Sequence, residues 1–341
     1  MTKRTRVFLL IAAGVLVLGV GAGLVAYYTG FTGLSVGSAN EPDELSYLPQ
    51  DSSLVAFANV RDVMASDLHR RLQEMRSADA ASGPNDFEAR TGIDIETDVD
   101  VVVASLAGGG DNERPLVVAR GRFDEARIEA LIREQGGQVE EYRNERLFIV
   151  SAGDEPFGVS FVESGVVAIG TVAAVRRAID TKATRGASVT GNEELMAQVR
   201  GMDQGNAWAV GRFDTLAGNR LPEAVASQLP PISWFAATGR VNGGVEGLVR
   251  VEAGTEQGAQ DLRQVVQGFM ALARLQTRDN TEFATLLNSL QLGGEGRTVS
   301  LSFSVPLELM DALGALQQRR EPPPQPPLPP APPAGPRPPA S

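Results

Sequence analysis

The first candidates for a functional site are four acidic residues at alternate positions of one short stretch. They are Asp94, Glu96, Asp98 and Asp100, and their spacing could suit metal binding. In an extended chain every second side chain points the same way, so these four would share one face and could offer oxygen ligands to calcium. An EF-hand loop needs a glycine at its sixth position and a glutamate at its twelfth, and the stretch has neither. Like charges also keep a loop extended in solvent, and we therefore predict no metal site.

His69 is the only histidine in the sequence, and we expect no catalytic or metal-binding role for it either. It stands beside Arg70 and Arg71 in a predicted helix, with no partner at the spacing of a triad or a metal site, so we expect an exposed structural residue. The chain has no phosphate-binding loop and no Gly-x-Ser-x-Gly elbow. It also has no cysteine, which excludes disulfides, thiolate catalysis and zinc–thiolate sites. The prediction is therefore no catalytic, cofactor-binding or metal-binding residue, and no cofactor.

A four-residue motif occurs twice, as Gly121-Arg122-Phe123-Asp124 and, 90 residues later, as Gly211-Arg212-Phe213-Asp214. Asn59-Val60-Arg61-Asp62 is a looser third copy, and each copy follows an apolar run typical of a strand. We expect the phenylalanine to lie under a sheet, the arginine to reach solvent or a carboxylate, and the aspartate to cap the next helix. Tandem copies of one strand–helix–hairpin unit would explain the repetition. A ligand-binding cluster of the arginines is the alternative.

The elements that carry these residues are short strands and amphipathic helices. Apolar runs predict strands at 54–58, 98–107, 116–120, 147–150, 157–162, 166–170, 207–211, 232–241, 245–252 and 298–305. Helical periodicity favours helices at 62–75, between Asp124 and Gly136, at 171–182, 193–200 and 255–276, and after Pro306. Glu163-Ser164-Gly165 and Asn242-Gly243 mark hairpins.

Within 298–305, hydroxyl and apolar residues alternate strictly, which is typical of a sheet with one wet face. That face, with Trp234 on a neighbouring strand, is a candidate binding surface, although a plain solvated face explains it too. We predict an α+β fold of mainly antiparallel sheets covered by helices on one face, in two related units.

The chain begins with a run that predicts a membrane anchor. Residues 7–28 hold no charge and no proline, and as a helix they would be ~33 Å long, enough to cross a ~30 Å hydrocarbon core. Lys3, Arg4 and Arg6 precede the run, whereas the first charges after it are acidic. Because basic flanks stay in the cytoplasm, we expect the N-terminus inside and the rest outside a bacterial cytoplasmic membrane. A cleaved signal peptide, cut near Gly37-Ser38-Ala39, is the alternative.

The predicted organisation therefore has five parts. They are a cytoplasmic stub with a transmembrane signal-anchor helix (1–28), a flexible linker (29–44), a first α+β unit (45–202), a second α+β unit (203–320) and a disordered tail (321–341) in which 12 of 21 residues are proline. A small-xxx-small spacing from Gly19 to Gly23 would let two anchors pack together.

Two features of the sequence resemble a known family. They are the repeated strand–arginine–aspartate units and the segment Tyr47-Leu48-Pro49-Gln50-Asp51-Ser52-Ser53-Leu54-Val55. Both resemble an uncharacterised bacterial family of N-terminally membrane-anchored extracytoplasmic proteins. The resemblance implies a compartment and a style of fold, and it implies no catalytic residues.

These patterns together indicate a membrane-anchored, extracytoplasmic, non-catalytic binding or scaffold protein of the bacterial cell envelope. A carrier of an apolar ligand and a hydrolase-type enzyme that uses surface carboxylates are the alternatives. The expected partners are the membrane and an envelope protein or cell-wall material. The net charge of −11 would repel phosphate backbones, so nucleic acid is not expected.

Overall fold

The structure is a computed structural model that describes residues 41–75, 92–108, 114–134, 136–151, 156–184, 187–202, 205–213, 229–241, 244–276 and 287–306. The predicted anchor, Asp214, the last predicted helix and the proline-rich tail lie outside these residues. None of the helices in the described ranges combines the length and the apolar character that crossing a bilayer requires.

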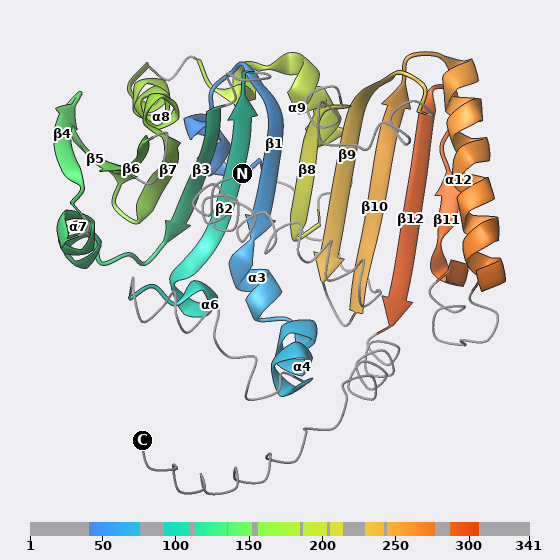
Figure 1. The fold of residues 1–341 in the computed structure, drawn as a ribbon, viewed down its shortest axis with the longest axis horizontal. Coiled ribbons are helices and arrows are strands. Elements are labelled where there is room, and N and C mark those ends of the chain that lie inside the picture. Colours follow the sequence, from blue (N-terminus) through green and yellow to red (C-terminus); the bar gives the residue numbers. More distant parts are fainter. Residues whose placement is uncertain are drawn as a thin grey trace, which may run out of the picture.

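Within those ranges twelve strands form one antiparallel sheet in the order β11-β12-β10-β9-β8-β1-β2-β3-β7-β6-β5-β4 (Figure 1). The strands are β1 (Ser52–Asn59), β2 (Val99–Ala107), β3 (Arg114–Gly121), β4 (Gln138–Tyr142), β5 (Glu145–Ser151), β6 (Pro156–Glu163), β7 (Val166–Thr171), β8 (Ala207–Arg212), β9 (Ile232–Val241), β10 (Gly244–Ala253), β11 (Gln291–Gly293) and β12 (Thr298–Pro306). The predicted α+β class with mainly antiparallel strands is confirmed.

The two halves of the chain join at the centre of this sheet. β1 and β8 pair there, from Leu54 opposite Gly211 to Ala58 opposite Ala207. Each half contributes three neighbouring strands to the sheet, β1-β2-β3 or β8-β9-β10, and a helix follows the third of them: α7 (Glu125–Glu134) or α12 (Glu256–Gln276). The last strand, β7 or β12, then returns beside the third. The two predicted units therefore do not have separate sheets, because β1 and β8 satisfy each other's backbone groups instead of leaving two edges.

Helices lie on both faces of the sheet. On one face, named here the α8 face, lie η1 (Asp43–Tyr47), α8 (Val172–Thr184), η4 (Val189–Gly191) and α9 (Glu193–Arg200). The other face carries α7, whose Ile132 packs with Phe148, and α12, whose Leu262 packs with Val299; it is named the α12 face. The prediction of helices on one face only is therefore wrong. Central strands such as β8, in which Ala207 to Gly211 are all buried, are apolar on both faces and need cover on both.

The first described residues, 41–51, form a segment that we name the N-terminal strap. Leu45 and Leu48 are fully buried in the core of the α8 face. The backbone N–H of Gln50 donates to the carbonyl of Ala187 at 2.9 Å. Asp51 accepts from Arg177 on α8 at 2.9 Å, and this guanidinium holds the pKa of the Asp51 carboxyl below its usual range. The strap is thus packed into the fold and belongs to it.

A polar network ties the strap to the first half of the sheet. Tyr47 donates its hydroxyl to Glu163 Oε2 at 2.8 Å, and the buried Glu44 is paired with Arg120. Arg120 also lies 3.5 Å from Glu163. Because Tyr47 donates to it, the pKa of Glu163 lies below the ordinary value, and Arg120 acts in the same direction. Burial, together with Glu163, raises the pKa of Tyr47, so the hydroxyl stays a donor.

Candidate functional site

The hydroxyl side of β12 forms an open part of the α8 face. Its alternate residues Ser300, Ser302 and Ser304 lie opposite Arg250, Leu248 and Glu246 of β10. The register continues through β9, where Ala236 lies opposite Arg250 and belongs to the core under α8 and α9. Val299, between the hydroxyls, points to α12 on the other face. The alternation predicted from the sequence is thus found only in part, because Val299 is buried whereas Leu301 and Phe303 are half-buried, as are the serines on the other side.

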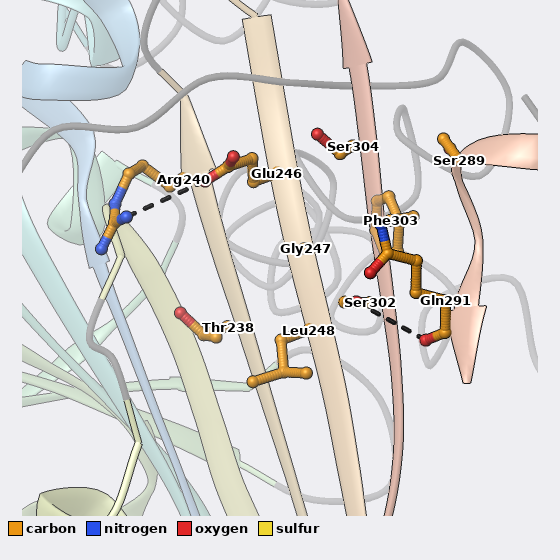
Figure 2. A pocket seen from close by; sticks show the side chains of 10 residues that line it. All are labelled: Thr238, Arg240, Glu246, Gly247, Leu248, Ser289, Gln291, Ser302, Phe303 and Ser304. Carbon is orange, nitrogen blue, oxygen red and sulfur yellow. Dashed lines mark hydrogen bonds and ion pairs between the residues drawn. The ribbon is translucent and has the colours of Figure 1, made fainter. Parts of the chain in front are cut away.

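A groove of about 320 Å³ lies over this region (Figure 2). Strands β9 to β12 and the residues just before β11 supply its lining, which consists of Thr238, Arg240, Glu246, Gly247, Leu248, Ser289, Gln291, Ser302, Phe303 and Ser304. Most of these side chains donate or accept hydrogen bonds. Figure 2 shows Arg240 and Glu246 on one side of the groove and Ser289 and Gln291 on the other, with serine hydroxyls between them.

One charged pair stands in this lining. Arg240 Nη1 lies 3.9 Å from Glu246 Oε2 across the β9–β10 pair, and the two side chains are 11% and 25% exposed. Such a pair neutralises its own charge and still offers both donors and acceptors to a ligand.

Neighbouring hydrogen bonds hold the floor of the groove. Thr238 Oγ1 accepts from the N–H of Gly205 at 3.0 Å, which ties β9 to the residues before β8. Ser302 Oγ donates to the carbonyl of Gln291 at 3.5 Å, which joins β12 to β11. The groove is therefore built from regular strands, and regular strands hold side chains in fixed positions. Its chemistry suits recognition of a polar ligand by hydrogen bonds.

The four alternating carboxylates do not meet on one face, so the expectation of an extended stretch is wrong. The stretch contains a helical turn, α6 (Ile95–Asp98), in which alternate side chains diverge. Asp94 caps this turn by accepting from the N–H of Glu96 at 2.9 Å, and Asp98 accepts from the N–H of Asp94 at 3.0 Å. Asp100 lies between Arg61 and Arg122. Across the described ranges, no group of three or more histidine or acidic side chains is placed to hold a metal ion.

His69 is less exposed than predicted. It lies on α4 (Asp67–Met75), its side chain is 21% exposed, and Nε2 is 3.3 Å from Glu96 Oε2 on α6. Its ring thus lies between two short helices, α4 and α6.

The arginines of the repeated motif do not form one cluster. Arg61 and Arg122 both pair with Asp100, the second at 3.7 Å, so these two reach a carboxylate as predicted. Arg212 instead lies over the ring of Trp234, 5.8 Å from its centroid. Trp234 is buried and donates to Glu194 of α9 at 3.2 Å, so it is not part of the groove.

The other motif residues behave as local reasoning suggests. Asp124 caps α7 by accepting from the N–H of Arg127 at 3.0 Å, and Phe123 packs against two clusters of the core. Phe213 is half-buried at the end of β8.

The sequence also held a signal for the groove that motif reasoning missed. The predicted hairpin at Asn242-Gly243 brings residues on either side of it together, and Arg240 and Glu246 are oppositely charged residues at nearly equal distances from the turn. Cross-strand pairs of this kind favour opposite charges. The contributions of Ser289 and Gln291 depend on the placement of β11 and had no such signal.

The fold and site thus define a mixed helix-and-strand protein with a large antiparallel sheet and a polar groove on its open part. No protein family matches the sequence, and no curated protein matches it. Among solved structures the chain is distantly similar to the protein TP0453 in three crystal forms. Form I has a TM-score of 0.45 at 10% identity and covers 82% of this chain and 98% of that chain. Form III has a TM-score of 0.44 at 8% identity and covers 82% of this chain and 99% of that chain. Form IV has a TM-score of 0.41 at 11% identity and covers 81% of this chain and 96% of that chain.

Proposed function

We propose that this chain is a membrane-anchored, extracytoplasmic, non-catalytic binding or scaffold protein of the bacterial cell envelope. The observation that carries the binding role is the groove on the open part of the α8 face, where hydroxyls, an amide and the Arg240–Glu246 pair converge. The ligand expected there is a polar polymer of the envelope, such as a cell-wall strand or an extended segment of an envelope protein.

The proposed location rests on the sequence. The uncharged run 7–28 follows three basic residues, and the chain beyond it starts with acidic ones. The net charge of −11 also favours partners other than nucleic acids.

We also propose that the two halves of the chain are related units within one sheet. Both share a plan of three neighbouring strands, a helix after the third, and a final strand that returns beside the third. The antiparallel β1–β8 pair would then lie on an approximate two-fold axis between the units.

The groove favours this function over the two alternatives. A carrier of an apolar ligand would use an apolar cavity, whereas the groove is lined mainly by hydrogen-bonding groups. A hydrolase-type enzyme would use carboxylates that converge in a cleft, whereas Asp94 and Asp98 cap and brace a helical turn and Asp100 is paired with arginines.

A capture experiment tests the proposal. The full-length chain, purified from detergent-solubilised membranes, should retain an envelope component, and Ser302→Leu should reduce that retention several-fold because the leucine fills the groove. Ser300→Leu is the matched control, since Ser300 lies on the same strand and the same face but does not line the groove. Equal loss in both variants, or no loss in either, would contradict a binding role for the groove.

A further inference from the structure

The second half of α12 is apolar almost all round. Residues 265–273 contain no charge and a single polar side chain, Gln267. A helix that is apolar on every side is normally buried on more than one side. The first half of α12 shows what one-sided burial looks like, because Ala259 and Leu262 pack on the sheet while Glu256, Gln260 and Asp261 are exposed.

Three large apolar side chains on this part of α12 are exposed in the single chain. Phe269, Leu272 and Leu275 have exposed fractions of 64%, 51% and 55%. They recur every third residue, so they form a stripe that winds around the helix, from Phe269, about two turns after Leu262 on the side of the sheet, through Leu272 to Leu275 on the opposite side. Beside them, a Cβ added at Gly268 would meet nothing within 4 Å. We name Gly268, Phe269, Leu272 and Leu275 the α12 patch.

We infer that the α12 patch is a self-association surface at which two copies of this chain pack their α12 helices antiparallel. The spacing is self-complementary. A two-fold axis through Leu272 sets Leu272 against its own copy, sets Phe269 against the partner's Leu275, and repeats that contact in reverse, which is the symmetry of an isologous dimer. Gly268 leaves room for the partner helix to approach.

The charges around the patch favour a second copy over a lipid surface. Residues 265–273 carry no charge, so two copies bury none when they meet. Helices that lie on membranes usually carry a basic polar face, whereas the charged residues of α12 are Glu256, Asp261, Arg263 and Arg274.

The size of the patch sets the strength of this contact. Stable interfaces bury ~800 Å² on each partner, more than three side chains provide. We therefore expect a weak dimer that forms where copies are concentrated, and a test that traps the contact is more sensitive than one that measures mass.

Disulfide trapping suits this chain because it has no cysteine of its own. Full-length Leu272→Cys in detergent solution should give a disulfide-linked dimer on mild oxidation, several-fold more than Gln267→Cys. Gln267 is exposed on the same stretch of α12 but lies on another side of the helix, so it is the matched control. A thermal melt like that of the wild type shows that both variants are folded.

The antiparallel arrangement of the two helices can be tested separately. A mixture of Phe269→Cys and Leu275→Cys chains should cross-link more than either chain alone, because Phe269 meets the partner's Leu275. Dimer yields for Leu272→Cys no higher than for Gln267→Cys would overturn the inference. So would self-linking of Phe269→Cys as strong as that of the mixture, which would indicate parallel helices, or cross-linking only to a different protein.

Discussion

At the scale of single residues, Asp100 shows that an acidic residue of the alternating stretch pairs with arginines of the repeated motif. In the sequence it is one of four alternating acids, but in the structure it faces Arg61 and Arg122 from two different strand ends. Arg61 and Arg122 are about 60% exposed, and exposed ion pairs of this kind contribute little to stability. The charges of Arg61, Arg122 and Asp100 therefore position strand ends.

The contact of Tyr47 with Glu163 gives a prediction at this scale. Tyr47→Phe removes the hydrogen bond that contributes most to lowering the pKa of Glu163 and should reduce the free energy of unfolding by about 1 kcal/mol at neutral pH. A carboxyl with a lowered pKa in the folded state contributes stability above its unfolded pKa and loses it as the pH falls through the folded pKa. The difference between wild type and variant should therefore shrink in acid.

Denaturant unfolding of the full-length chain in detergent, at pH 7 and at about pH 3, measures this difference. Glu163→Gln is the useful comparison, since it retains an acceptor for Tyr47 and removes the titration. If Tyr47→Phe destabilised the chain equally at both pH values, the hydrogen bond to ionised Glu163 would not be the cause.

Residue roles that depend on neighbours in the sequence could be predicted, whereas those that depend on register could not. Asp124 caps α7 as expected because its acceptor and donor are three residues apart. The meeting of Arg61 and Arg122 at Asp100 requires the register of β1, β2 and β3, which no local pattern contains.

At the scale of elements, α12 was the easiest to predict and the helix expected at 62–75 the least successful. The first has a long apolar stripe with few breaks. The second is divided into α3 (Val60–Met64) and α4, because the Ser66 hydroxyl accepts from the N–H of His69 at 3.2 Å and starts a new helix. Serine competes for backbone groups in this way, so hydrophobic periodicity alone gives a continuous helix where the chain makes two.

The motif around α7 gives a prediction at this scale. Phe123→Ala should cost more stability than Asp124→Ala, because the phenylalanine packs against two core clusters and the aspartate supplies one cap. We expect roughly 3 kcal/mol for the first, the low end for a phenylalanine because Phe123 is only partly buried, and about 1 kcal/mol for the second.

Denaturant melts of the two full-length variants would compare these values. A silent Phe123→Ala would mean that the ring contributes no packing energy, and the motif would then be better explained as a surface feature with a binding role for Arg122.

At the scale of the whole molecule, the joining of two halves into one sheet was beyond sequence reasoning. The two clear copies of the motif follow β3 and β8, which hold different places in their halves, whereas the looser copy at Asn59 follows β1, the counterpart of β8. The repeat therefore marks strand ends and does not mark equivalent strands. The pairing of β1 with β8 brings together residues about 150 positions apart, and local patterns do not encode such distant pairs.

The proposed topology gives a prediction at the same scale. A reporter that is active only in the cytoplasm, fused after Ser341, should remain silent because the basic residues before the apolar run hold the N-terminus inside. Exchanging Lys3, Arg4 and Arg6 for glutamate should raise the reporter signal. A reporter active in the unaltered chain would reverse the proposed compartment.

The N-terminal strap has a mechanical consequence if the chain is tethered at its N-terminus. A force applied through the tether would act on the strap first. The contact of Asp51 with Arg177 would transmit part of that force to α8, and the contact of Tyr47 with Glu163 would transmit part of it to the end of β6. The strap then continues directly into β1, the strand that is bonded to both halves of the sheet (Figure 1). Tension would thus be shared among several contacts loaded in parallel before it reached the centre of the sheet, and the groove between β9 and β12 would keep its shape under load.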